Sequence, residues 1–502
     1  MTVDKYLSKI LGTIINKNRR IILAMKETNE KKSAGYSSPY EFEGRIPLSQ
    51  AIPLGLQHVM AMFIGNLTPL IIVMGVCGLT ADAGFSELRT ALLQNAMIIA
   101  GIVTLVQMFS IGPVGGKVPI VMGTSSGFLG VLNNTVTACG GGIIAYGAIM
   151  GACLIGGIFE GILGAFLKPL RKFFPPIVTG SVVIAIGLSL LGVGINYFCG
   201  GSGKADYGSL PNLFLGVVLI VIVLLKHFAP QNSIFSSSAI LFGILAGYIV
   251  AVIMTFVLPN TGVDADGAKY TYSWVVNFSQ VKDAAWIAIP SFMGFGALSD
   301  VKMSFQASAI IPIGIMFIVT AIETVGDISA CIEGGMDREA TDTELSGGVI
   351  CDGLGSAFAA FFGVLPNTSF SQNVGLVSMT KVVNRFAISM GAIFLILCGF
   401  CPKIGAIMSI MPQSVLGGAA VMMFASILIS GIQLITKEPI GSREITIISV
   451  AIGLGYGLGA TTGATAHLPY YIQLIFGGSG IVPCSLAAII LNILLPKESK
   501  SV

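Results

Sequence analysis

The stretch "PNTSFSQNVGLVSMTK", Pro366 to Lys381, interrupts one of the most apolar regions of the chain. It carries three amide side chains and five hydroxyl groups, whereas its neighbours "AFAAFFGVL" and "FAISMGAIFLIL" are apolar enough for the centre of a bilayer. Polar, proline-interrupted backbone survives at membrane depth only where it lines a cavity inside the protein. The stretch therefore predicts a broken helix that faces an internal polar site.

The composition places the chain in one broad class. Of the 502 residues, 54% are hydrophobic and 10% are charged, whereas about 25% of the residues in a soluble protein are charged. We therefore expect a polytopic membrane protein surrounded by lipid. The net charge of +3 gives no indication of a nucleic-acid partner. The nine cysteines are scattered, and we interpret them as buried packing residues, with no disulfide, metal site or cofactor expected.

Apolar runs of about 17–25 residues are candidates for transmembrane helices. The chain contains fourteen such runs, of which the third and the tenth are short and polar. They cover residues 52–75, 91–110, 119–136, 143–167, 177–198, 210–226, 235–258, 309–332, 346–364, 367–384, 386–401, 413–435, 444–460 and 472–495. The expected fold class is therefore an all-α membrane protein with fourteen transmembrane segments.

The distribution of basic residues predicts the orientation. If the N-terminus is cytoplasmic, fourteen spans place 21 of the 27 Lys and Arg residues on the cytoplasmic side, as the positive-inside rule requires. Residues 1–50 are expected to form a cytoplasmic tail without a cleavable signal peptide, and residues 497–502 form a second cytoplasmic tail. The pattern predicts a multi-pass protein of the cytoplasmic membrane with both termini inside.

The chain divides near residues 259–308, a polar segment that we expect to link two halves on the extracytoplasmic side. Seven spans in each half require opposite orientations in the membrane, which is the arrangement of an inverted repeat. The third spans of the two halves read "VPIVMGTSSGFLGVL" and "LPNTSFSQNVGLVSM", each with a proline, a Thr-Ser pair and a glycine. Paired interruptions of this kind indicate the binding site of a transporter. The alternative is two ordinary helices that pack closely through small residues.

Ionisable residues inside the predicted spans are few. They are His58, Glu160, Glu323, Asp327 and Asp352. A charge in hydrocarbon is costly and is usually functional. Glu323 and Asp327 are four residues apart and hence on one helix face, where two carboxylates repel, so we expect one of them to hold a proton. We interpret the pair as proton-coupling residues; the alternative is a solvated pair in a wide cavity.

The other three ionisable residues have separate interpretations. His58 is either a neutral histidine that hydrogen-bonds a carboxylate or a structural core histidine. Asp352, at the predicted start of the ninth span, either caps that helix or hydrogen-bonds the internal site. We count both with the proton-coupling group. Glu160, in "GIFEGILG", has no polar neighbours in the sequence, and we interpret it as peripheral.

Several motifs carry a resemblance to a known family. "SQNVGLVSMTK" resembles the signature of the nucleobase–ascorbate transporter family, in which an amide or acid is followed by Asn, any residue, Gly, four residues, Thr and a variable, often basic residue. Those places are filled here by Gln372, Asn373, Gly375, Thr380 and Lys381. "QHVMAMF", "AIETVGD" and "CDGLGS" are similar to the family's motifs in the first, eighth and ninth spans. The resemblance covers nearly the whole chain.

The resemblance implies roles for individual residues. Glu323 corresponds to the eighth-span glutamate that hydrogen-bonds the substrate, and Gln372 to the tenth-span substrate residue. Asn373 and Asp352 correspond to positions that support affinity and geometry, and His58 corresponds to the first-span histidine.

One position departs from the family pattern. The family often has a phenylalanine after Thr-Ser in the third span. The ring of this residue stacks on the base, and its backbone N–H is offered to the base as a donor. Ser126 stands there in this chain, and Phe128 follows two residues later. The N–H survives this change, but the stacking ring must come from elsewhere or be lost.

The resemblance also implies an architecture. The expected core domain comprises residues 51–167 and 309–401, and the expected gate domain comprises residues 168–258 and 402–496. The usual assembly of the family is a homodimer joined through the gate domains.

The function expected on these grounds is proton-coupled import of an oxidised purine base, xanthine or uric acid. Family members with glutamine at position 372 resemble one another in taking up these bases, whereas uracil carriers have glutamate and ascorbate carriers tend to have proline. A carboxamide offers both a donor and an acceptor, which matches the alternating edge of an oxidised purine. The alternatives are a uracil permease and, more distantly, an anion exchanger of the same fold. No nucleophile–base pair or phosphate-binding loop indicates an enzyme.

Overall fold

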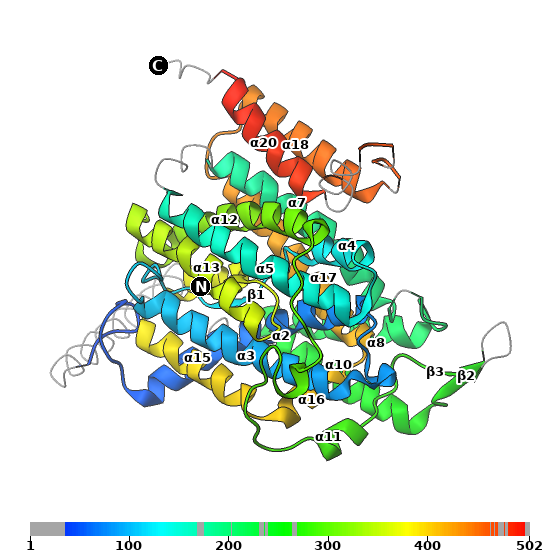
Figure 1. Cartoon of the computed structure of the whole chain (residues 1–502). Coiled ribbons are helices and arrows are strands. Elements are labelled where there is room, and N and C mark those ends of the chain that lie inside the picture. Colours follow the sequence, from blue (N-terminus) through cyan, green and yellow to red (C-terminus); the bar gives the residue numbers. More distant parts are fainter. Residues whose placement is uncertain are drawn as a thin grey trace, which may run out of the picture.

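The computed structural model describes residues 36–167, 175–201, 203–229, 235, 239–263, 269–461, 463–465, 467–469, 476 and 480–496. Within these residues the chain is almost entirely helical (Figure 1). Most of the expected N-terminal tail (residues 1–35) and the whole C-terminal tail (residues 497–502) lie outside the described residues. The fold is that of a multi-pass membrane protein.

Helices lie at the positions that the apolar runs predict. In the first half they are α2 (Leu48–Val76), α3 (Ser86–Phe109), α4 (Leu129–Ala138), α5 (Gly142–Ala165), α7 (Pro176–Phe198), α8 (Leu210–Leu225) and α10 (Ala239–Val257). In the second half they are α12 (Ala307–Met336), α13 (Asp342–Phe361), α14 (Ser371–Thr380), α15 (Arg385–Gly399), α17 (Gln413–Ile435), α18 (Ser442–Ala460) and α20 (Ile481–Leu494).

Not every one of these helices is a membrane span by length and hydropathy. Among the described residues, seven helices are long and apolar enough to cross a bilayer, or eight if α15 and the short helix α16 (Pro402–Ser409) count as one bent span. The two helices of that pair meet at 83°. The eleventh apolar run ends at residue 401, and α16 was not foreseen from the sequence. Pro402 is the first residue of α16, a position where the missing N–H of proline costs nothing.

The two expected interruptions take a definite form. The third and tenth segments begin as short strands, β1 (Met122–Thr124) and β4 (Asn367–Ser369), and continue as the short helices α4 and α14. The strands pair antiparallel, with Met122 opposite Ser369 and Thr124 opposite Asn367. Segments about 245 positions apart in the chain therefore meet at their breaks, and the backbone groups that a helix would pair internally are paired between strands instead.

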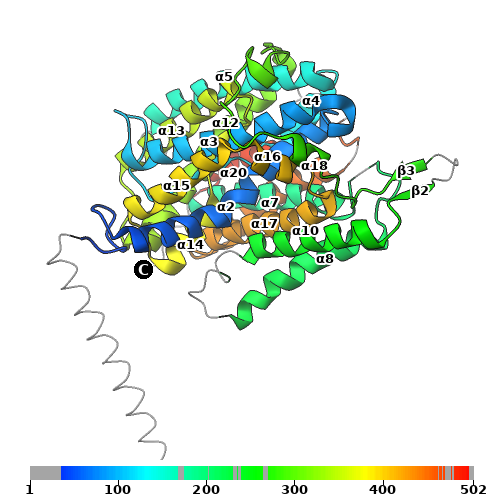
Figure 2. The same cartoon turned by 90° about the horizontal axis from the view of Figure 1, so that it is seen from below.

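Figure 2 shows how the helices are arranged in the bundle. In that view α8 and α10 lie along one edge of the molecule, and α5 and α13 lie along the opposite edge. Helix α5 packs against α12 and α13, whereas α7 packs against α17, α18 and α20. The break lies among four helices, because β1 contacts α2 and α3 and β4 contacts α12 and α13.

Two further segments were not foreseen from the sequence. Within the expected linker, β2 (Thr261–Val263) and β3 (Lys269–Thr271) form an antiparallel hairpin that projects from the bundle in Figure 2. The linker also contains the single turns α11 (Ser279–Asp283) and η4 (Gly296–Leu298). At the other end, the described part of the N-terminal tail is attached to the start of α15, where Pro39 O accepts hydrogen bonds from the backbone N–H groups of Val383 and Asn384 at 3.1 Å each.

Candidate functional site

The candidate site is the junction of the two broken segments. Ser125 N donates to Pro366 O at 2.8 Å, and Phe370 N donates to Val121 O at 3.0 Å, which extends the strand pairing on both sides. Helices α4 and α14 then leave the antiparallel strands in opposite directions. Because the first N–H groups of a helix have no partner within the helix, both helices present donors and a partial positive charge to the junction.

Polar side chains on three neighbouring helices fix this junction. Asn66 on α2 accepts from Thr124 N at 2.8 Å, and Thr104 on α3 accepts from Met122 N at 2.9 Å. Ser356 on α13 accepts from Asn367 N at 2.9 Å. These three polar residues were not singled out from the sequence, where the available signal was a polar side chain inside a predicted span.

Glu323 lies beside the start of α4. Its side chain is buried, and Oε2 has no hydrogen-bond partner among the described residues. A Cβ atom placed on Gly127 would lie 3.6 Å from Glu323 Oε2 and 3.5 Å from Ser125 Oγ. The carboxyl group of the eighth segment therefore faces the break in the third segment. Ser126 adjoins this point and is partly exposed.

Asp327 is bound to the other break. Its Oδ2 accepts from Ser369 Oγ at 2.7 Å and from Ser371 Oγ at 2.9 Å. These hydroxyl groups belong to β4 and to the first turn of α14. Two donors satisfy this carboxylate oxygen, so Asp327 is a hydrogen-bonded anchor of the tenth segment rather than a solvated partner of Glu323 in a wide cavity.

Asp352 is placed differently from its prediction. It is fully buried in the third turn of α13, and the helix is capped instead by Thr341 with Glu344 in a capping box. Thr324 on α12 donates to Asp352 Oδ2. The alternative in which Asp352 caps its helix is therefore wrong, because α13 begins ten residues earlier than Asp352.

His58 hydrogen-bonds an amide rather than a carboxylate. It is buried on α2, and Asn373 Nδ2 donates to His58 O at 2.9 Å and lies 3.4 Å from Nδ1. The pair ties the first segment to the first turn of α14. Of the two sequence alternatives, the histidine–carboxylate contact gives way to this one because α2 packs against α14, and the alternative of a structural core histidine agrees with the burial of His58.

The remaining signature residues extend away from the junction along α14. Gly375 has no heavy atom within 4 Å of the position where a Cβ would stand, and Thr380 donates to Leu376 O at 2.8 Å within its own helix. Lys381 ends the helix in a left-handed conformation and forms an ion pair with Asp337 at 2.7 Å. The side chain of Gln372 lies outside the described part of the structure.

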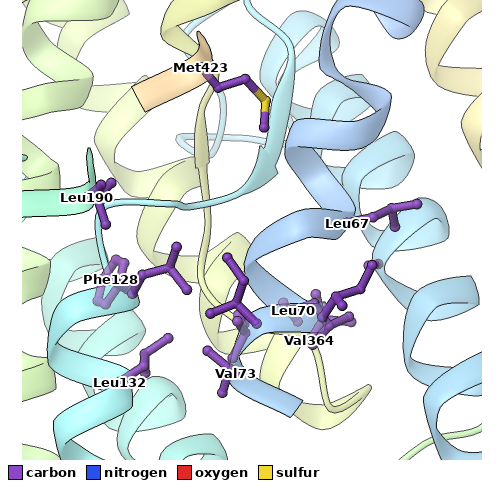
Figure 3. Close-up of a cluster of buried hydrophobic side chains, with 14 of the residues drawn as sticks. Leu67, Leu70, Val73, Phe128, Leu132, Leu190, Val364 and Met423 are labelled. Atoms are coloured by element: carbon purple, nitrogen blue, oxygen red, sulfur yellow. The ribbon is translucent and has the colours of Figure 1, made fainter. Parts of the chain in front are cut away.

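Phe128 lies in an apolar cluster at the start of α4. Its ring is fully buried and packs edge-on against Phe317, with 4.8 Å between ring centroids. Figure 3 shows Leu70 on α2, Leu190 on α7 and Met423 on α17 around the same region. A second aromatic side chain, Phe370, was not singled out from the sequence and packs against the backbone of β1 at Gly123.

Glu160 is not peripheral, contrary to the sequence interpretation. It has no exposed surface, and its Oε1 accepts from Thr320 Oγ1 at 3.2 Å. The burial comes from tertiary packing, because α5 lies against both α12 and α13. These helices cover Glu160, although its neighbours in the sequence are apolar.

The junction brings together buried carboxyl groups and backbone donors. Buried carboxyl groups face helix N-termini, which provide acceptors and donors close together. Within the described residues, no group of three or more His, Cys, Asp or Glu side chains could hold a metal ion.

An apolar helical bundle in which two broken segments meet among buried carboxyl groups has the architecture of a membrane transporter, and the protein is a transporter rather than an enzyme. It belongs to the Permease family, whose sequence model, Xan_ur_permease, matches residues 49–463. The family resemblance noted in the sequence is thereby confirmed.

Individual relatives are similar over almost the whole chain. A xanthine permease of Bacillus subtilis (strain 168) is 34% identical over 456 residues, which are 90% of this chain and 95% of the relative. The uric acid transporter UacT of Escherichia coli (strain K12) is 32% identical over 468 residues, which are 92% of this chain and 89% of the relative.

A solved structure shares the fold at lower sequence identity. The transmembrane domain of the cyanobacterial bicarbonate transporter BicA has a TM-score of 0.53 at 14% identity, and the match covers 89% of this chain and 98% of that domain. At that identity the likeness concerns the fold alone.

Proposed function

We propose that the protein imports a nucleobase, specifically an oxidised purine such as xanthine or uric acid, together with protons across the cytoplasmic membrane. The single observation that carries the proposal is the carboxyl group of Glu323. It is buried beside the start of α4, and one of its oxygens has no hydrogen-bond partner in the part of the chain that the structure describes. The xanthine and uric acid carriers among the relatives support the substrate class.

Recognition of the base follows from the donors and acceptors at the junction. Glu323 accepts hydrogen bonds from ring N–H groups of the base, and the N–H of Ser126 at the start of α4 donates to a ring carbonyl. Gln372 supplies one donor and one acceptor. Phe128 is packed against Phe317 and shapes the wall of the site. Asn373 holds α14 against His58.

Proton coupling is assigned to Glu323, with Asp327, Asp352 and His58 as its supporting residues. Because a lone charge in this setting is costly, a loaded carrier is favoured when substrate and proton are bound together. Asp327, held by Ser369 and Ser371, links the protonation state of α12 to the position of the tenth segment. Release of the proton inside resets the carrier.

The transport cycle requires two bodies that move against each other. We assign residues 51–167 and 309–401 to a core that carries the site, and residues 168–258 and 402–496 to a gate. The fourteen segments then form a seven-plus-seven inverted repeat, both termini are cytoplasmic, and two copies associate through their gates. The apolar cluster in Figure 3 joins α2 and α4 of the core to α7 and α17 of the gate, so movement of the core must open it.

Two alternatives are kept. A uracil permease of the same family would use the same junction with a smaller ring. An anion exchanger shares the fold through BicA, but a buried carboxyl group facing the site disfavours an anionic substrate, and this observation ranks the exchanger last.

Uptake in a bacterium that lacks purine transport tests the proposal. Labelled xanthine, uric acid, hypoxanthine, uracil and bicarbonate are compared, with and without an uncoupler, and Glu323→Gln serves as the matched inactive carrier. We expect accumulation of xanthine or uric acid that the uncoupler abolishes. Preferential uptake of uracil or bicarbonate contradicts the purine assignment. Uptake in vesicles that persists on a sodium gradient alone, without a proton gradient, contradicts the proton assignment.

A further inference from the structure

Glu160 is a buried acid, and the described helices that pack around it contain no basic side chain. It is the one ionisable carboxyl group on α5, and the helices that pack against α5 are α4, α12 and α13. None of these four helices contains a lysine, arginine or histidine. Lys302, whose backbone touches α5, does so at Gly147, 13 residues and roughly 20 Å along the helix from Glu160. An ion pair with these helices therefore cannot explain the residue.

The acidic groups that act on Glu160 lie on α12 and α13. Asp352 on α13 and Glu323 on α12 act on it electrostatically, and Asp327 lies one turn beyond Glu323. Helix α4 has no titratable side chain. Two buried carboxyl groups, those of Asp352 and Glu323, therefore act on Glu160, and ionisation of all three would be strongly unfavourable.

Glu160 and Asp352 have matching surroundings. Each has one oxygen that accepts from a threonine of α12, Thr320 for Glu160 and Thr324 for Asp352. These threonines are four residues apart and therefore lie on the same face of the helix. In each carboxyl group the second oxygen, Glu160 Oε2 or Asp352 Oδ1, is buried without a partner in the described part of the chain.

The backbones that carry the two acids are in direct contact. A Cβ on Gly353, the residue after Asp352, would lie 2.3 Å from Gly161 N and 2.8 Å from the carbonyl carbon of Glu160. The contact exists because glycine faces glycine at the crossing of α5 and α13. The two acids therefore cannot separate without parting the helices.

We propose that Glu160 and Asp352 share one proton and that Glu160 thereby acts as a positioning residue behind the substrate site. The proton is bonded to an oxygen of one carboxyl group and hydrogen-bonded to an oxygen of the other, so the pair carries one negative charge. Thr324 donates its hydroxyl proton to Asp352, and Ser369 of β4 donates its own to Asp327, so the two hydroxyl oxygens are in contact at 3.2 Å without a proton between them. The state of the pair therefore acts on the tenth segment, and through it on Asp327, which also binds Ser369.

This inference rests on the proposed function, since it concerns the same site. It predicts a specific effect of pH. When the pH rises enough to remove the shared proton, two adjacent buried charges remain, and the junction is displaced. In Glu160→Gln the amide N–H replaces the shared proton permanently and cannot be lost, so the alkaline loss of substrate affinity is smaller than in the wild type.

The experiment measures equilibrium binding of labelled xanthine to the full-length protein in lipid nanodiscs between pH 5 and pH 9. We expect Glu160→Gln to bind within about threefold of the wild type at neutral pH and to lose less affinity at alkaline pH. Glu160→Ala should bind about tenfold more weakly at neutral pH, because Asp352 is left without its partner. An unchanged pH profile in Glu160→Gln, together with normal binding by Glu160→Ala, would overturn the proposal.

Infrared spectroscopy keeps the test independent of binding and of variants that fold poorly. The wild-type protein should show a protonated-carboxyl band, and the isosteric Thr320→Val should shift that band by removing the hydrogen bond to Glu160 Oε1. Thr320→Ser, which retains the hydroxyl, is the matched control. An identical band in Thr320→Val would overturn the proposal. If the wild type accumulates no xanthine or uric acid, the proposed function fails, while the band still decides whether Glu160 takes part in holding a proton.

Discussion

The two helix breaks share a backbone plan but differ in chemistry. In the third segment, Asn66 and Thr104 hold β1 from neighbouring helices, and the start of α4 is filled by the apolar ring of Phe128. In the tenth segment, Ser369 and Ser371 donate to a buried carboxylate on α12. The third-segment break is thus fixed by neutral groups and packing. The tenth-segment break is held by the neutral Ser356 and also by two hydrogen bonds to a carboxyl group, and charge-assisted hydrogen bonds are roughly twice as strong as neutral ones.

This difference indicates a division of roles between the two halves of the chain. The third segment supplies a frame and backbone donors, which many side chains would permit. The tenth segment, together with α12, supplies side chains that donate and accept hydrogen bonds in particular places. Substitutions in the second half should therefore cost more than the corresponding substitutions in the first half.

The largest effect is expected at Glu323. Glu323→Gln should abolish accumulation of substrate, because glutamine keeps the volume and one acceptor but cannot cycle a proton. Glu323→Asp should also be severely impaired, since the carboxyl group is withdrawn by about 1.5 Å, a displacement that can cost on the order of a hundredfold. The measurements are surface expression, substrate binding and proton-driven uptake for each variant.

The variant Glu323→Gln also provides the clearest test that could contradict the coupling role of Glu323. Full accumulation by a well-expressed Glu323→Gln would remove this residue from the coupling mechanism. Asp327 or His58 would then be the better candidate, and the charge asymmetry between the two breaks would need a different explanation.

A second large effect is expected when both donors to Asp327 are removed. The double variant Ser369→Ala/Ser371→Ala leaves a buried carboxylate without these hydrogen bonds, each worth about 1.5–3 kcal/mol because the acceptor is charged. Uptake should fall by at least about tenfold. Ser378→Ala is the matched control, because the Ser378 hydroxyl donates to Val374 O within α14 and not to Asp327. Equal uptake by the double variant and the control would show that Asp327 does not depend on the tenth segment.

The sequence predicted the positions of the helices and breaks but not the pairing between them. Proline and glycine in "VPIVMGTSSG" and "LPNTSFSQNVG" indicate interruptions because they disturb a helix locally. That β1 and β4 pair with each other depends on contacts between distant segments, for which a single sequence has no local signal.

Glu160 and His58 show the same limit for individual side chains. Glu160 has apolar neighbours in the chain, but its burial is decided by the glycine contact of α5 with α13. His58 could be predicted as buried, whereas its partner Asn373 comes from a helix more than 300 positions away. Residues on one helix face, such as Glu323 and Asp327, were predictable because their spacing follows helix geometry.

An intermediate effect is expected at the substrate-recognition position of the tenth segment. Gln372→Glu replaces an amide donor with an acceptor, and a buried mismatch of this kind costs about 1–3 kcal/mol. Affinity for xanthine or uric acid should fall by roughly five- to a hundredfold, and uracil should become a better competitor. Competition curves with unlabelled bases measure both changes. Unchanged curves in a well-expressed variant would rule out a role for this amide in choosing the base.

The smallest effect is expected at the third-segment break, where the frame supplies backbone rather than side-chain chemistry. Ser126→Ala retains the backbone N–H at the start of α4, so purine affinity should change by no more than about twofold, as is usual for a substitution outside a buried network. Ser126→Phe should instead tighten binding, because a ring at this position can stack on the base and aromatic pairs contribute about 0.5–1.5 kcal/mol. Binding of labelled xanthine to both variants distinguishes the two contributions. A loss of about tenfold or more in Ser126→Ala would mean that the serine hydroxyl itself binds the substrate, and the third segment would then provide side-chain chemistry as the tenth does.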